Sequence, residues 1–373
     1  MPQKASLKDS IRDVLNWLAK HKTKEFRAVV MPDFFFDRFV QYPENFHRFS
    51  RDALQVIRRK GGSIDNVRQV NFRGGNAPNT ASALASLGAT VFPIIETDSL
   101  GLTMLKHFLG PLNVDLSHVK TGGQASITTA LEFPEKDNTV NLMLRDMGSL
   151  VNFGPEGLTS LDYDLLAKAD VVCVFNWAGT RKYGTDLALN VFRYVKTKGE
   201  GMTYYDTADP MPNKEKIPDL VERVLLKDLV DVLSVNENEA VQYANYMNPK
   251  RVSSLRKKHK KLEHLALECA KLLSEHMSAR IDLHTTAYSA TFRKDTEPQM
   301  VSAFKVKTLR ATGAGDSWNA GNIYAEQQGL PDKIRLTIAN AVAAYYVSSA
   351  GAAHPGIDQL AGFLSAQITK QRR

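Results

Sequence analysis

Hydrophobic residues recur along the chain with two different periods. Near the N-terminus, Leu7, Ile11, Val14, Leu15 and Leu18 fall on one face of a helix. Beyond them, short β-branched and aromatic runs alternate with longer patterns of helical period. This alternation predicts strands at 26–31, 90–95, 171–175, 202–205, 230–235 and 280–285, and helices at 77–87, 236–246, 262–276, 315–328 and 333–349.

Strands that alternate with helices are typical of an α/β fold whose mostly parallel central sheet is doubly wound by helices on both faces. Two stretches, 67–72 and 125–144, are alternating or extended and have no helical pattern. They predict a small antiparallel sheet that projects from the main one, as a lid over a cleft or as an edge hairpin. We therefore expect a helical extension at 1–25 and a main domain at 26–373, with lid segments near 38–73 and 124–146.

Composition supports a globular protein. Apolar residues make up 43% of the 373 residues and charged residues 24%, which is ordinary for such a chain. The only two cysteines, Cys173 and Cys269, exclude a disulfide scaffold and a closed all-cysteine zinc site. They favour a reducing, cytoplasmic setting. No apolar run approaches the roughly 20 residues that span a bilayer, and no secretion signal is apparent, so we expect no membrane partner.

The charge balance bears on the partners. Lys and Arg number 48 against 40 Asp and Glu, so the net charge is +8. This modest excess suits a phosphorylated ligand, and a nucleic-acid partner is the weaker expectation. One dense basic run lies at 256–261. A solvated helix start or loop is its ordinary interpretation, and a phosphate or nucleic-acid patch is the alternative.

The segment 311–321 carries the clearest chemistry. It follows an extended stretch at 301–309 and leads into a helix, with Gly313, Ala314 and Gly315 before Asp316. The glycines permit a tight turn, and the free N–H groups of the helix start attract an anion. A carboxylate beside that anion can take a proton from an attacking hydroxyl while the N–H groups stabilise a migrating phosphoryl group. Alternatively, Asp316 is an ordinary helix cap.

A second glycine turn lies near the N-terminus. Gly74 and Gly75 are followed by Asn76 and Asn79 at the start of a predicted helix. Glycines allow a ligand to approach the backbone, and the amides can hydrogen-bond neutral hydroxyls in both directions. A turn with an asparagine cap is the alternative.

Two aspartates follow the first strand, where α/β sheets bind ligands. Asp33 and Asp37 could each hold a sugar diol, although either alone is also a common surface or capping residue. The phenylalanines at 34–36 between them suit core packing, or an apolar pocket for a nucleobase.

In this order the segments resemble the ribokinase-like (PfkB) family of carbohydrate and nucleoside kinases, over most of the chain from residue 26. The family signature Asp-Thr-x-Gly-Ala-Gly-Asp ends here at 313–316. Three further family motifs are matched by Gly74, Gly75 and Asn79, by Asn236 and Glu239, and by Asp98 and Gly101, and Asp37 matches the strand-end aspartate that grips substrate hydroxyls.

The resemblance implies an ATP-dependent kinase that phosphorylates a hydroxyl of a small sugar or sugar acid. A nucleoside kinase is the alternative, and a binding protein without turnover is a third possibility. Asp316 would be the base, 313–315 the anion hole, and Asn236 and Glu239 would order Mg²⁺. A homodimer is possible. The acceptor would be held by Asp33, Asp37, Gly74, Gly75, Asn76 and Asn79, and the nucleotide by Thr312, His284, Thr286 and Asn340.

Two departures from the family pattern matter. Arg310 stands where the signature begins with aspartate, which puts the family's activating monovalent cation in doubt. Its guanidinium could hold the glycine turn or point to solvent. In addition, 282–286 reads Asp-Leu-His-Thr-Thr where the family has Thr-x-Gly, so contacts to the phosphate donor are expected to differ.

Overall fold

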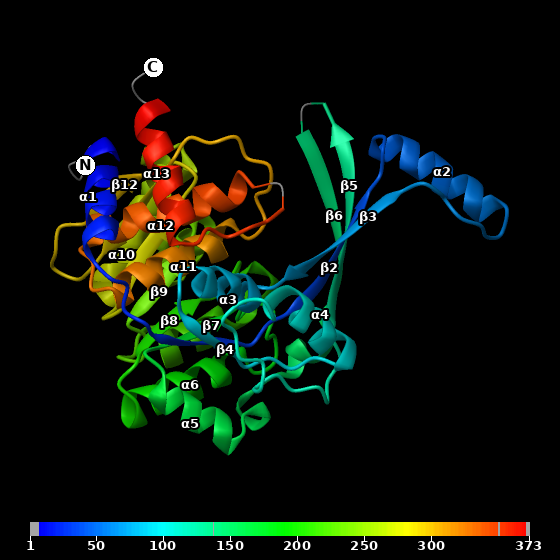
Figure 1. Cartoon of the computed structure of the whole chain (residues 1–373). Helices are drawn as coiled ribbons and strands as arrows, with labels where there is room; N and C mark the ends of the chain where they lie inside the picture. The colour runs from blue at the N-terminus through cyan, green and yellow to red at the C-terminus, as the bar shows by residue number, and fades with distance from the viewer. Residues whose placement is uncertain (1–6, 137, 350, 371–373) are drawn as a thin grey trace.

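The computed structural model describes residues 7–136, 138–349 and 351–370, and the main body of that part is an eight-stranded sheet with helices on both faces (Figure 1). Its strands are β1 (Arg27–Met31), β4 (Thr90–Pro93), β7 (Val171–Phe175), β8 (Met202–Asp206), β9 (Val232–Val235), β10 (Arg280–His284), β11 (Tyr288–Phe292) and β12 (Gln299–Ser302). The order is β12-β11-β10-β9-β8-β7-β1-β4. All pairs from β4 to β10 are parallel, and β11 and β12 are antiparallel additions. The predicted doubly wound sheet is confirmed.

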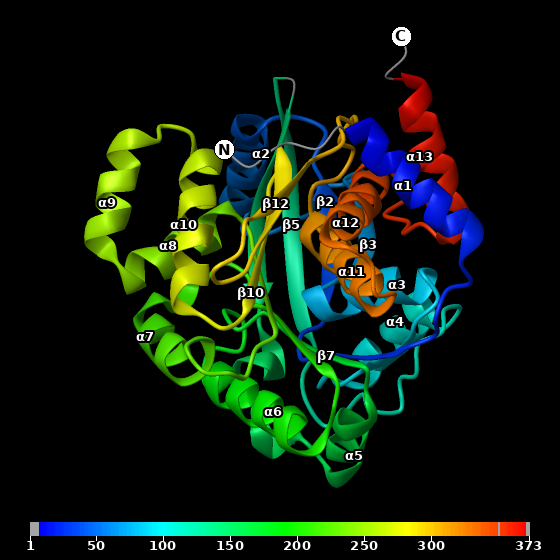
Figure 2. The same ribbon diagram turned by 90° about the vertical axis from the view of Figure 1, so that its left-hand side faces the viewer.

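Alternate residues of the buried strands feed two separate cores. In β1, Ala28 and Val30 belong to one hydrophobic cluster, and Val29 and Met31 to the other, as the two-residue period of a strand requires. Figure 2 shows the two helical layers on either side of the sheet. The first layer is α1 (Leu7–Lys20), α3 (Asn76–Ser86), α11 (Ala314–Gln327), α12 (Asp332–Val347) and α13 (Ile357–Lys370). The second is α5 (Ser160–Lys168), α6 (Gly184–Lys198), α7 (Ile217–Leu220), α8 (Glu237–Met247), α9 (Pro249–Lys258) and α10 (Leu262–His276).

A four-stranded lid sheet projects from the body (Figure 1). It consists of β2 (Phe35–Gln41), β3 (Arg68–Gly74), β5 (Ser126–Glu135) and β6 (Asn138–Asp146), in the order β3-β2-β5-β6. The prediction of an antiparallel sheet is wrong at its centre, because β2 pairs with β5 in parallel. The strand β2 was itself not predicted, since the aromatic run that opens it was assigned to core packing or a pocket.

Two helices accompany the lid and were not predicted. The helix α2 (Phe46–Arg58) lies at the outer end, where Phe46 and Phe49 contact Phe133 of β5. The helix α4 (Ser99–Leu109) packs beside Phe34, and Asp98 caps it by accepting from the Gly101 N–H at 2.7 Å. Short helical turns lie at 148–152, 155–157, 211–216 and 221–225.

The structure also shows the positions of the N-terminal helix, the basic run and the stretch before the glycine turn. The helix α1 packs on α12 and α13, while residues 1–6 of the predicted extension lie outside the described residues. The basic run 256–261 ends α9 and joins it to α10, so it is not a helix start, and its lysines and arginine are exposed. The extended stretch 301–309 is a strand only to Ser302. No helix among the described residues has the length and apolarity needed to cross a membrane.

Candidate active site

Asp316 lies in the first turn of α11 and joins the two glycine turns. Only 6% of its surface is exposed. Asn76 Nδ2 donates to its Oδ1 at 2.7 Å, and Asn79 Nδ2 donates to its Oδ2 at 3.0 Å. Burial raises the pKa of Asp316 well above its ordinary 3.8, and the neighbouring carboxylates of Asp206 and Asp33 add to the rise against the hydrogen bonds from the amides. The asparagines therefore position the carboxylate.

The turn before α11 needs glycine at its first position. Gly313 has φ +89°, and a Cβ there would lie 2.5 Å from the Tyr346 hydroxyl oxygen. That hydroxyl donates to the Thr312 carbonyl at 2.9 Å, and the Ser317 hydroxyl donates to the Gly313 carbonyl at 2.8 Å. Packing and hydrogen bonds thus hold the turn in place.

The N–H groups of this turn are not equivalent. The Ala314 N–H donates to the Ala311 carbonyl at 3.1 Å. Within the described chain, the N–H groups of Gly313 and Gly315 have no backbone acceptor. The Asp316 N–H likewise has no backbone acceptor among the described residues, so these three donors at the start of a helix are available to an anion.

Asp37 lies on β2 and faces the cavity in front of Asp316. Its residue surface is 9% exposed, and a Cβ on Gly74 would lie 2.1 Å from its Oδ2, so the carboxylate needs glycine on the adjacent strand. Burial raises the pKa of Asp37 to about 6, while Thr128, Arg310 and Arg145 act to lower it. A carboxylate held here can accept hydrogen bonds from hydroxyl groups of a ligand.

Asp33 lines the same cavity but is bound mainly to the protein. It is fully buried, and it accepts from the N–H groups of Asn76 at 2.8 Å and Ala77 at 3.0 Å. The Asn176 amide adds a third donor at 2.8 Å. Gly75, at φ +96°, gives the backbone the turn that these bonds require. Asp33 therefore anchors the start of α3, much as its capping interpretation predicts.

These residues surround a cavity of about 330 Å³ at the carboxyl ends of the parallel strands. A second cavity of about 460 Å³ adjoins it and is lined mostly by apolar side chains, among them Phe304, Val306 and Val347. The two cavities share only Asn236, His284 and Gly315 among their lining residues. We refer to them as the acceptor cavity and the donor cavity, after the roles that the family resemblance implies for their residues.

Of the four residues predicted to bind nucleotide, three line the donor cavity. They are His284, Thr286 and Asn340, whereas Thr312 lines the acceptor cavity. His284 stacks on Trp318 with ring centroids 5.0 Å apart, and Asn340 accepts from the indole N–H of Trp318 at 2.9 Å.

Asn236 and Glu239 form a capping box at the start of α8. The Glu239 carboxylate accepts from the Asn236 backbone N–H at 2.9 Å and from its side-chain amide at 2.6 Å. Glu239 is 2% exposed, so its carboxylate is buried rather than directed to solvent. Burial raises its pKa well above its ordinary value, and the Asp206 and Asp209 carboxylates raise it further. A cation would relieve this crowding of negative charge.

Sequence reasoning missed several residues of the acceptor cavity. Asp206 ends the buried strand β8, and Asn176 directly follows the buried strand β7. Polar residues at the carboxyl ends of predicted parallel strands are a signal that the sequence contains. Arg145 and Phe39 come from the lid, and only the pairing of β2 with β5 brings these lid strands beside the cavity. No local pattern indicated them.

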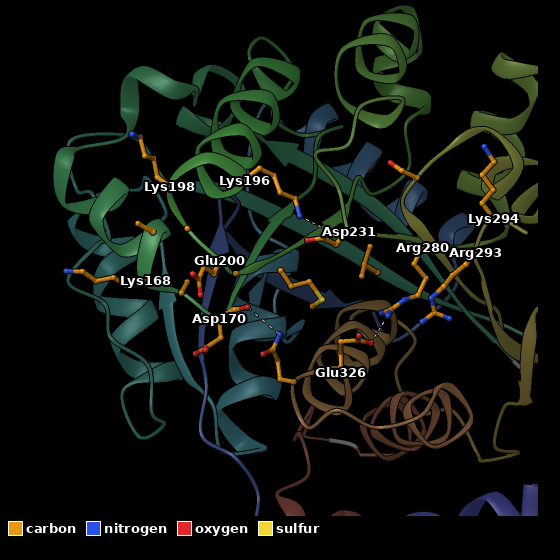
Figure 3. Close-up of a pocket in the computed structure, with 18 residues that line it drawn as sticks. Lys168, Asp170, Lys196, Lys198, Glu200, Asp231, Arg280, Arg293, Lys294 and Glu326 are labelled. Atoms are coloured by element: carbon orange, nitrogen blue, oxygen red, sulfur yellow. Dashed lines mark hydrogen bonds and ion pairs between the residues drawn. The ribbon is translucent and has the colours of Figure 1, made fainter. Parts of the chain in front are cut away.

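A larger cavity of about 1180 Å³ lies at the opposite edge, where β7 to β10 begin (Figure 3). Some of its charges are paired within the protein: Lys196 meets Asp231 at 2.5 Å and Arg280 meets Glu326 at 2.6 Å. Lys168 and Lys198 point outward (Figure 3). Because none of the signature residues reaches this cavity, the site is assigned to the carboxyl edge.

Comparison with known proteins agrees with this architecture. The ribokinase of Arabidopsis thaliana complexed with ribose and ATP superposes with a TM-score of 0.66 at 17% identity, covering 91% of this chain and 99% of that one. The adenosine kinase from Sinorhizobium meliloti gives a TM-score of 0.67 at 16% identity, covering 94% and 100%. At these identities the likeness concerns the fold.

A 5-dehydro-2-deoxygluconokinase of Lacticaseibacillus casei is 37% identical over 78 residues, which are 20% of this chain and 24% of that protein. The match thus spans about a quarter of the length of this curated relative. The family model described as pfkB family carbohydrate kinase matches residues 49–359, which is most of the chain. The chain therefore belongs to the pfkB carbohydrate kinase family.

Proposed function

We propose that this protein is an ATP-dependent kinase that phosphorylates a hydroxyl group of a small sugar or sugar acid. The observation that carries the proposal is the position of Asp316 in the acceptor cavity, at the turn through which that cavity adjoins the donor cavity. A phosphoryl group passing between the two cavities would meet the free N–H groups of Gly313 and Gly315.

The residues support a direct transfer. The acceptor hydroxyl loses its proton to the Asp316 carboxylate as its oxygen bonds to the γ-phosphorus, and the bond from phosphorus to the bridging oxygen breaks to release ADP. A buried carboxylate with a raised pKa is a stronger base than an ordinary aspartate. Asn76 and Asn79 hold it in place, and Asp37 binds other hydroxyls of the acceptor.

Mg²⁺ fits the cluster of Asp206, Glu239 and Asn236, where buried carboxylates repel one another. No set of three or more histidine, cysteine or acidic side chains among the described residues could hold a metal ion by itself. This suits Mg²⁺, which commonly takes one or two carboxylates and completes its shell with water and substrate phosphates. Bound there, the ion would neutralise charge on the phosphates.

A nucleoside acceptor is less well supported. A nucleobase would need an open aromatic face, and Phe35 is the phenylalanine of the 34–36 run that lines the acceptor cavity. The Arg145 guanidinium already covers that ring at 4.6 Å from its centre. Phe34 and Phe36 pack in the α4 cluster instead. A protein without turnover is disfavoured because the proposed base and the free N–H groups of the anion hole are in place.

The test is release of ADP in the presence of Mg²⁺-ATP and a panel of acceptors. The panel should hold hexoses and pentoses, aldonic and keto-deoxy acids, including 5-dehydro-2-deoxygluconate because of the named relative, and nucleosides. A sugar or sugar acid that gives turnover, lost in Asp316→Asn, would support the proposal. Turnover with nucleosides alone, or none with any member, would overturn it. Cytoplasmic location and homodimer formation stay predictions.

A further inference from the structure

Two arginines line the acceptor cavity although its other charged residues are acidic. Arg310 comes from the loop before α11, and Arg145 from β6 of the lid. On this basis we propose that the acceptor carries an anionic group, a carboxylate or a phosphate, which Arg310 and Arg145 bind at a distance from the reacting hydroxyl. The inference rests on the proposed kinase function and names the acceptor class and the residues that select it.

Arg310 reaches from the body of the protein to the lid. Its guanidinium carbon lies 4.0 Å from the centre of the Phe72 ring and 5.2 Å from that of Phe39, so it neither points freely into solvent nor merely supports the glycine turn. Its Nε is buried without a hydrogen-bond acceptor among the described residues. The Tyr346 hydroxyl is its polar neighbour. Stacking on rings fixes the plane of a guanidinium and leaves its N–H edge available.

Arg145 approaches the cavity from β6, an edge strand of the lid sheet. It is exposed and stacks on Phe35 at 4.6 Å. In the described part of the chain, no carboxylate lies within 4 Å of either Arg145 or Arg310, although other arginines are paired at 2.6–3.3 Å. Two guanidinium groups that line a ligand cavity and have no carboxylate partner among the described residues suit the planar, bidentate recognition of carboxylate or phosphate.

An alternative role would be to neutralise the buried acids of the site. Both arginines do act to lower the pKa of Asp37. However, this long-range influence is insufficient, because the pKa of Asp37 still stands at about 6 and neither arginine makes an ion pair with it. An anion bound by the arginines would supply the carboxylate or phosphate partner that neither has among the described residues, while Asp37 remains free for hydroxyl groups.

The first experiment compares matched acceptors by kcat/KM at fixed Mg²⁺-ATP. Glucose is paired with gluconate, and fructose with fructose 6-phosphate, so that the carboxylate and phosphate arms are separate. We expect one anionic member to exceed its neutral partner by about tenfold or more. The KM of that member should rise between about 50 and about 300 mM salt, because exposed charges are screened.

The second experiment uses variants. Arg310→Met and Arg145→Met should each lower kcat/KM for the anionic acceptor by about 10- to 100-fold, with KM for ATP within about twofold. Arg310→Lys keeps the charge without the fork and should fall between. Arg38→Met is the matched control, since Arg38 is also a lid arginine over a phenylalanine but lies outside the cavity.

A higher kcat/KM for neutral sugars would overturn this inference and leave the kinase proposal standing. Variants that lose kcat/KM equally for neutral and anionic acceptors would do the same. If no acceptor is phosphorylated, the kinase proposal fails. The anion site can then still be tested by calorimetric titration of gluconate and of fructose 6-phosphate into the wild type and Arg310→Met. Binding that the variant loses supports the anion site, and binding that it keeps, or absence of binding to the wild type, refutes it.

Discussion

Replacing Asp316 by asparagine should separate activity from stability. The substitution keeps the size of the side chain and removes the base. A positioned general base contributes about 10²–10⁴-fold to rate, which corresponds to about 3–5 kcal/mol of activation free energy. We expect kcat to fall by this factor, while Asp37 and the donor cavity still bind their ligands.

The same change should make the stability of the variant, relative to the wild type, depend on pH. Folding raises the pKa of Asp316 above the 3.8 of an exposed aspartate, so folding favours its protonated form. The wild-type carboxylate therefore destabilises the fold once it is ionised, by about 1.4 kcal/mol for each tenfold gain in its proton affinity on folding. This penalty is absent below pH 3.8, grows as pH rises, and is complete above the folded-state pKa.

The new amide loses one charge-assisted hydrogen bond, worth about 1.5–3 kcal/mol, from Asn76 or Asn79. Because Asn76 is only partly buried, its amide can turn over and present oxygen instead of nitrogen, which recovers a bond. The charge penalty grows with pH and the lost hydrogen bond does not, so the stability of the variant relative to the wild type should rise from acid pH to about pH 8.

The assays are ADP release and thermal unfolding across pH, with the exposed Asp164→Asn on α5 as the matched control. Turnover above about a third of wild type would refute the role of base. An inactive variant whose stability is reduced by the same amount at every pH would show that Asp316 is a structural residue, and the loss of activity would then carry no mechanistic meaning.

Three further outcomes follow from the site. Asp37→Asn should raise the acceptor KM by about 10- to 100-fold with little change in the KM for ATP, and equal losses of affinity for both ligands would refute its role. In the wild type, the acceptor KM should rise as pH drops below about 6, because Asp37 then gains a proton. Glu239→Gln should raise the Mg²⁺ concentration for half-maximal rate, measured by magnesium titration, and an unchanged titration would reduce Glu239 to a cap. Rates in K⁺, Na⁺ and tetramethylammonium at equal ionic strength should agree, because Arg310 places a permanent positive charge where the family signature has aspartate; stimulation by K⁺ alone would contradict this.

The lid depends on pairing between distant strands, which the local sequence pattern does not encode. The alternation at 125–144 predicted strands, and β5 and β6 are there. Their partner β2 was not predicted, because the three consecutive phenylalanines 34–36 do not alternate with polar residues as a half-buried strand would. In addition, its parallel pairing with β5 joins segments about ninety residues apart in the chain. Register between distant strands depends on tertiary packing, which no local period encodes.

The residues of the acceptor cavity also differ in what the sequence indicates and what only the fold decides. Asp316 and Asn79 were singled out by their motifs, yet the hydrogen bond between them spans 237 residues. From the sequence, each of these polar residues could be either a ligand contact or a helix cap. Only the fold assigns Asp33 mainly to the start of α3 and leaves Asp37 facing the cavity.

By itself, the sequence determined the doubly wound sheet, the two glycine turns and the family resemblance, because each is carried by short segments whose pattern is local, even where the segments lie far apart in the chain. Hydrophobic period and backbone freedom are local properties, and they act before the elements meet. The tertiary structure alone decided that Arg310 stacks on the lid, that Arg145 lines the same acceptor cavity, and that no carboxylate of the described residues pairs with either. The charge of a cavity depends on which distant side chains converge there, and that convergence exists only once the sheet and the lid have packed.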